Sequence, residues 1–170
     1  MTITLYAQPC DLAASGFYFK DAATFQKKAA NLKNDFGQHV EEFEIQFIDS
    51  DDEIDCALAN AFGINQVNFA AFLNCAENWE DWEKFHFILA VGECGYSFDY
   101  ETVSPDDFDV DVFGVETLKE LAERFLEDGY YGEIPESLQF YIDTDAIARD
   151  LAADYSEATI AGNSFVYRCG

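Results

Sequence analysis

Acidic residues dominate the middle of this chain. Between Asn34 and Leu118 the sequence contains 21 aspartates and glutamates and a single base, Lys84. Like charges at this density repel one another and oppose the compact state. The segment can therefore fold only if its apolar residues build a core that outweighs the repulsion, while most of the carboxylates remain in water.

The apolar content is high enough for such a core. Of the 170 residues, 49% are hydrophobic, and they include 17 phenylalanines, nine tyrosines and two tryptophans. Disordered chains lack this much apolar surface and cannot offset the entropy lost on ordering. We therefore expect a folded protein of one or two ordinary domains, or of a few very small ones.

The acidic residues fall into three patches, within 41–55, 77–83 and 99–111. The whole chain carries a net charge of −25, whereas a small soluble domain carries a net charge of magnitude about 2–8. Nucleic acids and anionic membranes are unsuitable partners, because both require cationic side chains that face phosphates. Four of the nine bases cluster near the N-terminus, at Lys20, Lys27, Lys28 and Lys33.

Hydrophobic periodicity predicts a small α+β unit that ends near Gly63. Two short strands are expected at Thr2–Ala7 and Gly16–Phe19. Apolar residues at helical spacing predict a helix over Asp21–Phe36. The segment Glu42–Ile48 alternates strictly between apolar and polar residues, which predicts a half-buried strand with an acidic outer face.

Residues 64–102 are predicted to form a helical unit. One helix is expected over Gln66–Ala76, with Val67 on its inner stripe. A second helix is expected after Asn78, which can cap it, with Trp82 on the inner face. No internal repeat or low-complexity tract interrupts this part of the chain.

Residues 103–170 are predicted to form a second α+β unit. Alternation over Asp107–Phe113 predicts a strand, and helices are expected over Val115–Asp128 and Asp145–Asp154. A closing hairpin is expected over Thr159–Tyr167. On the first of these helices four glutamates recur at helical spacing and form one exposed stripe, namely Glu116, Glu120, Glu123 and Glu127. Arg124 can pair with Glu120 at i, i+4.

Motifs of catalysis and cofactor binding are absent from the sequence. It contains no GxSxG, GxGxxG, P-loop or HExxH pattern. We interpret His86, which lies among apolar residues, as a packed core histidine. The acidic stretches that begin at Asp49 and Asp107 lack the glycine and the final glutamate of a calcium loop. We therefore predict neither an enzyme nor a metal or cofactor site.

The five cysteines are odd in number and include no CxxC pair. This pattern differs from a disulfide framework and from a zinc site. We interpret them as reduced thiols, mostly buried as small apolar residues. No secretory signal is visible at the N-terminus, which carries no base within Met1–Leu12. These features predict a cytoplasmic protein.

An acidic, aromatic-rich domain without catalytic motifs suits one physical role in particular. Duplex DNA carries one negative charge per about 1.7 Å of axis, so 25 charges correspond to about 40 Å of duplex. Proteins that hold DNA in a basic channel are natural partners for such a surface. On physical grounds, the favoured hypothesis is a decoy that occupies the cleft of a DNA-binding protein.

The C-terminal part of the sequence resembles a known family. The stretch Gly132–Asp143, GEIPESLQFYID, is followed by ARDL at Ala148–Leu151. In this order the two motifs resemble the C-terminal part of the ArdA antirestriction proteins. A weaker similarity covers the acidic middle and the strand at Phe43–Ile48. Residues Met1–Gly37 depart most from the family pattern.

This resemblance implies a fold and a function. ArdA-like proteins are carried by mobile elements, mimic bent B-form DNA and block type I restriction–modification enzymes, chiefly at the DNA site of the methyltransferase core with its specificity subunit. The family is similar in being dimeric and elongated, with three small units. We therefore expect an α+β fold with an acidic, DNA-like surface, a homodimer, and units at 1–63, 64–102 and 103–170.

The resemblance implies distributed surface carboxylates rather than catalytic residues. In this sequence the candidate partner-binding residues are Asp49, Asp51, Asp52, Glu53, Asp55, Glu77, Glu80, Asp81, Glu83, Asp106, Asp107, Asp109, Asp111, Glu116, Glu120, Glu123 and Glu127. We interpret the apolar motif residues, among them Pro135, Leu138, Tyr141, Ile142 and Leu151, as core or dimer contacts.

Two alternative functions are consistent with the same composition. The acidic surface could inhibit another DNA-binding protein, such as a nuclease, a CRISPR effector or a repressor. A haloadapted domain would also be rich in acids and poor in lysine. However, haloadapted surfaces usually spread their acids evenly, whereas −20 of the −25 lies between Asn34 and Leu118 here.

Overall fold

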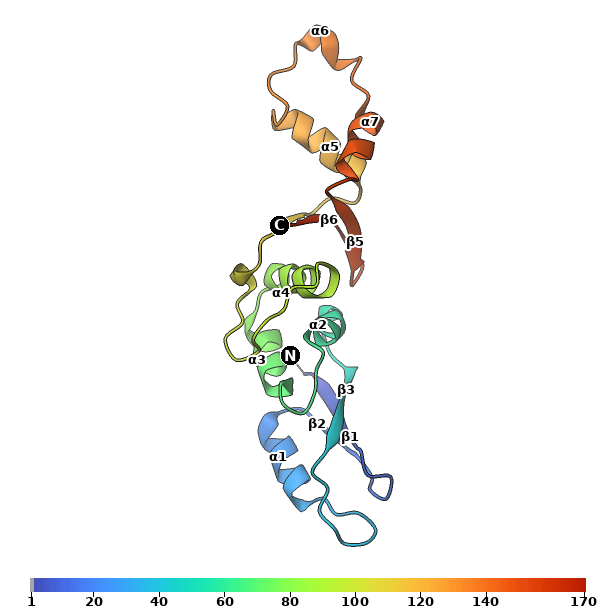
Figure 1. Cartoon of the computed structure of the whole chain (residues 1–170), viewed down its shortest axis with the longest axis vertical. Coiled ribbons are helices and arrows are strands. Elements are labelled where there is room, and N and C mark those ends of the chain that lie inside the picture. Colours follow the sequence, from blue (N-terminus) through green and yellow to red (C-terminus); the bar gives the residue numbers. More distant parts are fainter. Residues whose placement is uncertain (1) are drawn as a thin grey trace. The chain divides into compact units, whose positions relative to one another are not determined.

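The computed structural model describes residues 2–170, and these form two compact units. The first unit ends at Phe108, and the second is Asp109–Gly170. Helices account for 40% of the residues and strands for 20%, so the predicted α+β class is confirmed. Figure 1 labels the elements of both units.

The first unit begins with a three-stranded antiparallel sheet. Its strands are β1 (Thr4–Pro9), β2 (Phe17–Phe19) and β3 (Phe43–Asp49), in the order β2-β1-β3. The three strands predicted in this region are confirmed. Because side chains alternate across a strand, Leu5 and Ala7 on β1 both point into the core and are fully buried.

Helix α1 (Ala22–Asn31) covers this sheet. Its buried Phe25 packs against Phe19, with the ring centroids 5.0 Å apart. Asp21 caps the helix, because its carboxylate accepts the backbone N–H of Thr24 at 2.7 Å. The helix is shorter than predicted, because the backbone becomes extended at Leu32. Phe36, the last residue of the predicted helix, therefore lies beyond its end and is exposed.

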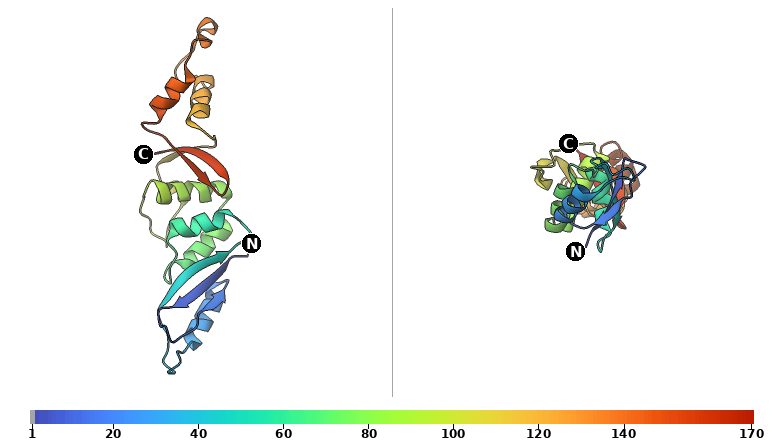
Figure 2. Two further views of the ribbon diagram at one scale, coloured as in Figure 1. Left: turned by 90° about the vertical axis from the view of Figure 1, so that its right-hand side faces the viewer. Right: turned by 90° about the horizontal axis from the view of Figure 1, so that it is seen from below.

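The remainder of the first unit is helical. It contains α2 (Ile54–Phe62), α3 (Phe69–Asn78), α4 (Asp81–Phe87), a π-helix at Ile88–Glu93 and a 3₁₀ helix at Pro105–Asp107. In Figure 2 these helices lie next to one another beside the sheet. Aromatic rings fill the space between them. The ring centroid of Phe62 lies 5.3 Å from that of Phe87 and 6.0 Å from that of Phe72.

Two predicted helix faces in this unit are wrong. Helix α3 begins at Phe69 and buries Phe69 and Phe72, so Val67 precedes the helix and is exposed. Helix α4 buries Phe87 and Lys84 instead of Trp82, which is exposed. The prediction from the apolar pattern of α4 is wrong at Trp82, because one of the two side chains that this helix buries, Lys84, is charged.

The second unit contains another three-stranded antiparallel sheet. Its strands are β4 (Val110–Phe113), β5 (Ser156–Ile160) and β6 (Asn163–Cys169), in the order β4-β6-β5. Strands β5 and β6 form the predicted hairpin. Ala161 and Gly162 at its turn both have positive φ angles, of 47° and 78°. Such angles match the twist of the two strands.

The second unit also contains helices α5 (Leu118–Glu127) and α7 (Thr144–Leu151). Leu121, Phe125, Tyr155 and Val166 form the core. The chain between the two helices makes an open loop that carries the short helix α6 (Glu136–Gln139) at its far end (Figure 1).

This open loop corrects part of the interpretation of the family motif. Leu138 and Tyr141 are exposed, as is Phe140 between them. Pro135 is exposed too. The loop holds these side chains away from the core of α5 and the sheet, so a core role is wrong for them. A role in dimer contacts stays a prediction.

The cysteines follow the prediction only in part. Cys10, Cys56 and Cys75 are free thiols, of which Cys75 is buried and the other two are exposed. Burial raises the pKa of the Cys75 thiol to about 11. Cys94 and Cys169 are not free thiols, so the prediction of reduced thiols is wrong for these two. Within residues 2–170, no helix has both the length and the apolar character needed to cross a bilayer.

Candidate partner-binding surface

Most of the predicted carboxylates lie at the protein surface. Of the 17 candidates, all except Asp52, Asp55 and Glu83 are exposed. Asp52 and Glu83 are half-buried, whereas the side chain of Asp55 is fully buried. A buried carboxylate is inaccessible to a partner, so we leave Asp55 out of the candidate surface.

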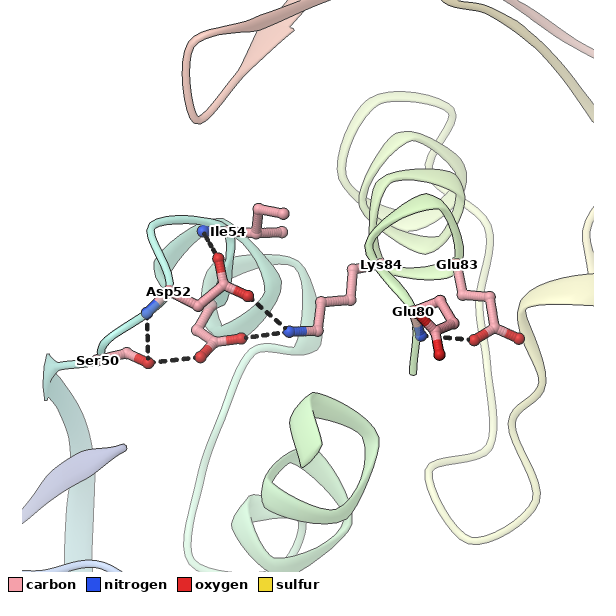
Figure 3. Close-up of polar contacts among 7 residues, drawn as sticks. Ser50, Asp52, Ile54, Glu80, Glu83 and Lys84 are labelled. Carbon is pink, nitrogen blue, oxygen red and sulfur yellow. Dashed lines mark hydrogen bonds and ion pairs between the residues drawn. The ribbon is translucent and has the colours of Figure 1, made fainter. Parts of the chain in front are cut away.

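Asp55 belongs to a buried ion cluster centred on Lys84. The Lys84 Nζ atom lies 2.9 Å from an oxygen of Asp52 and 3.0 Å from an oxygen of Asp55. Only 2% of the Lys84 side chain is exposed. Figure 3 shows the lysine reaching from α4 toward the segment that starts α2. Lys84 therefore joins two elements that lie about thirty residues apart in the sequence.

Further hydrogen bonds complete this cluster. The hydroxyl of Ser50 donates to the second oxygen of Asp55 at 2.5 Å, and the backbone N–H of Ile54 donates to Asp52 at 3.0 Å. Among the residues described, no buried side-chain nitrogen or oxygen lacks a hydrogen-bond partner. A buried charge is tolerated only when its partners are satisfied in this way.

The ion cluster shifts the pKa values of two members. Burial alone would lower the pKa of Lys84, but hydrogen bonds and charge from Asp52 and Asp55 outweigh it and raise that pKa above its usual value. Burial would likewise raise the pKa of Asp52. The hydrogen bonds from Lys84 and Ile54 dominate and lower it. Lys84 and Asp52 are therefore both charged at neutral pH.

The burial of Lys84 determines what the surface presents. Lys84 is the single base between Asn34 and Phe108. Because it points inward, the surface formed by this segment has carboxylates and no lysine or arginine. The same contact joins α4, which begins in the second acidic patch, to the start of α2 in the first. We call the exposed partner-binding candidates in these two patches the paired acidic surface, namely Asp49, Asp51, Glu53, Glu77, Glu80 and Asp81.

Several candidate carboxylates are held in place by backbone N–H groups at helix starts. Glu83 accepts from the N–H of Glu80 at 2.7 Å, in a capping box at the start of α4 (Figure 3). Glu120 accepts from Glu116 at the start of α5, at 2.9 Å. The partial positive charge of a helix N-terminus stabilises such carboxylates. This placement offsets part of the repulsion and restricts side-chain movement.

The second unit arranges its carboxylates differently. Glu120, Glu123 and Glu127 are exposed along α5, as predicted. Arg124, however, pairs with Asp128 at 3.6 Å, so its predicted pairing with Glu120 is wrong. Glu120 is instead directed back to the N–H of Glu116.

Strand β4 contributes one neutralised candidate. Asp111 pairs with Arg168 on the neighbouring strand β6, whose Nε donates at 3.0 Å. Arg168 also lies over the ring of Tyr155, 5.3 Å from its centroid. A partner would therefore meet Asp111 together with a cation.

The sequence did not reveal Lys84 as a member of the site. The available signal was its position as the single base in a long acidic segment, which points to a partner inside the protein. His86, in contrast, was interpreted as a packed core residue and is half-buried, with Nδ1 2.8 Å from the backbone oxygen of Pro105. Among the described residues, no three His, Cys, Asp or Glu side chains are grouped to hold a metal ion.

These features define an acidic α+β binding protein with carboxylates fixed on an ordered scaffold. A family model described as antirestriction protein (ArdA) matches residues 15–165. The chain therefore belongs to the ArdA family of antirestriction proteins, whose members interact with restriction–modification enzymes. A comparison with curated proteins gave no significant match.

Proposed function

We propose that this protein is a DNA mimic that inhibits type I restriction–modification enzymes. It occupies the DNA-binding cleft of the methyltransferase core, formed with the specificity subunit. It acts as a competitor of DNA rather than as an enzyme.

One observation carries this proposal. The segment 34–108 presents carboxylates and no lysine or arginine to solvent, because its single base, Lys84, is buried. A DNA-binding cleft is lined by cations that face phosphates. A surface without cations of its own presents no like-charge contacts to that cleft. Fixed carboxylates such as Glu83 and Glu120 avoid part of the entropy cost of ordering charges on binding.

A competition assay tests the proposal. A purified type I methyltransferase is bound to a labelled duplex and titrated with this protein at two salt concentrations. We expect displacement near stoichiometry that weakens at higher salt, because association of oppositely charged surfaces is screened. Failure to displace DNA at low salt, with the protein shown to be folded, would contradict the proposal. The partner would then have to be another DNA-binding protein.

Matched variants separate a defined surface from general acidity. The test variant carries Asp49→Asn, Asp51→Asn and Glu53→Gln in the paired acidic surface. The control carries Glu133→Gln, Asp150→Asn and Asp154→Asn, which are exposed and outside the candidate set. Both variants change the net charge by the same amount. We expect a clear loss of competition only for the first, whereas equal losses would mean that net charge alone governs binding.

We also propose that the active form is a homodimer joined through the loop between α5 and α7. This loop exposes Leu138, Phe140 and Tyr141, and Phe140 is 94% exposed. Apolar patches of this kind on an otherwise charged surface mark interaction sites. Light scattering coupled to size exclusion should give a dimer mass for the natural sequence and a monomer mass for Phe140→Ser/Tyr141→Ser. A monomer mass for the natural sequence would exclude the dimer.

A further inference from the structure

Three of the four lysines near the N-terminus, Lys20, Lys27 and Lys28, line two neighbouring recesses. One recess of about 500 Å³ lies between α1 and β2 and is lined by Phe17, Lys27 and Lys28, among others. A second recess, of about 290 Å³, is lined by Tyr18 and Lys20. Thr24 and Lys28 line both recesses, so the two lie next to each other. We call the two recesses together the lysine groove.

The lysine groove reverses the charge of the rest of the chain. Residues up to Lys33 contain four lysines and two acids, whereas the whole protein has a net charge of −25. One of these acids, Asp21, also lines the groove. Its carboxylate is occupied by the N–H and the hydroxyl of Thr24, at 2.7 and 2.8 Å. Among the described residues, no ion pair neutralises Lys20, Lys27 or Lys28.

The groove is also preorganised. Lys28 donates to the backbone oxygen of Tyr18 at 2.7 Å and lies over the ring of Phe17, 5.8 Å from its centroid. These contacts fix one cation on the wall of the groove. Lys20 and Lys27 stay exposed beside it. Strand β2 is an edge strand of its sheet, so no further strand covers this side.

We propose that the lysine groove is a second docking surface, and that it binds an acidic patch on the restriction–modification enzyme that this protein inhibits. The inference rests on the proposed function, because it takes the same enzyme as the partner. Charge complementarity favours an acidic protein surface over nucleic acid, which the carboxylates that cover the rest of the molecule repel.

The sign of one charge reversal distinguishes docking from a passive patch. In a passive patch, Lys27→Glu makes the decoy more anionic, so its binding to a basic cleft tightens. In a docking surface, the same change places like charges face to face, which weakens binding by about tenfold or more. Lys28 is left unchanged, because it supports the groove through Tyr18.

The experiment measures direct binding of labelled inhibitor to purified type I methyltransferase, and separately to the complete restriction enzyme. Lys27→Glu is compared with Arg149→Glu, which is exposed on α7 in the second unit and changes the net charge equally. We expect Lys27→Glu to weaken binding to at least one of these enzymes while Arg149→Glu does not. Circular dichroism confirms that both variants are folded.

The other outcomes overturn the proposal. Unchanged or tighter binding of Lys27→Glu to both enzymes means that the groove has no acidic partner there. A change confined to self-association assigns the groove to a second copy instead. If the natural sequence binds without displacing DNA, the proposed function fails, while the comparison of Lys27 with Arg149 still decides the groove. If it binds neither enzyme, both proposals fail.

Discussion

The acidic segment of the first unit, beyond Lys33, and the second unit handle their cations in opposite ways. The first unit holds 20 acids and five bases, and the second holds 14 acids and four bases. In the first unit, the single base beyond Lys33 is buried between two helices. In the second, three of the four bases form ion pairs at the surface with Asp145, Asp128 and Asp111.

This difference separates two uses of an ion pair. A buried pair positions elements and hides its cation, so the charge of the surrounding surface is undiminished. A surface pair contributes little stability and lowers the local negative charge. The first unit therefore combines a strongly anionic surface with an internal polar contact. In the second unit, folding depends on the apolar cluster around Leu121 and Phe125.

Removal of the buried cation is the most direct test of this comparison, and it should have the largest effect. Lys84→Ala leaves Asp52 and Asp55 without their partner in a buried position. Removing one member of a buried pair typically lowers the free energy of unfolding by about 3–5 kcal/mol. Both tryptophans, Trp79 and Trp82, lie in the first unit. Tryptophan fluorescence during denaturant unfolding therefore reports this unit.

Lys84→Arg is the control for this prediction. It keeps the positive charge, although the guanidinium geometry differs from that of the ammonium. We expect it to retain more stability than Lys84→Ala. If Lys84→Ala unfolded at the same denaturant concentration as the natural sequence, the buried cluster would have no structural role.

The second unit should respond instead to loss of an apolar contact. Leu121 is fully buried in its core. Leu121→Ala removes buried methyl groups and leaves a cavity, which costs about 2–5 kcal/mol. Hydrogen exchange should then accelerate in α5 and in strand β6. Leu138→Ala, at an exposed position of the open loop, should leave these rates unchanged. Equal effects of the two variants would contradict the assigned core.

Sequence patterns predict the two sheets better than the helices α2 to α4. The strands of both sheets, α5 and the final hairpin followed from alternation, helical periodicity and turn residues. The sequence analysis does not predict helix α2 (Ile54–Phe62), because this segment follows an acidic stretch that resembles a metal-binding loop. The inner face of α4 was wrong, since periodicity treats Lys84 as an outward position.

For the candidate surface too, the sequence predicts local properties but not tertiary contacts. Exposure of most predicted carboxylates follows from the cost of burying a charge. Sequence reasoning could not identify Asp55 as the exception, because its partner lies on a distant helix. The link between α4 and the start of α2 depends on the same tertiary contact. It was therefore not visible in either patch alone.

The pH dependence of the unfolding free energy tests the role of Asp52 within the buried cluster. Its lowered pKa means that its contribution to stability is present above about pH 3.8 and is lost as the pH falls through the folded value. Asp52→Asn removes a hydrogen bond to a charged group, which costs about 1–3 kcal/mol at neutral pH. The difference in unfolding free energy from the natural sequence should shrink in acid. A difference that stays constant down to pH 3 would contradict this assignment.

The smallest effect is expected where the second unit pairs its charges at the surface. Arg168 and Asp111 are each nearly half exposed, at 44% and 47% of their side chains. Water and salt screen such a pair, so Arg168→Gln should leave the denaturation midpoint within experimental error of the natural sequence. The same change unmasks Asp111 on β4 and makes this surface more anionic. Competition with DNA for the methyltransferase should therefore be unchanged or slightly stronger, and a loss of competition would show that Arg168 itself contacts the partner.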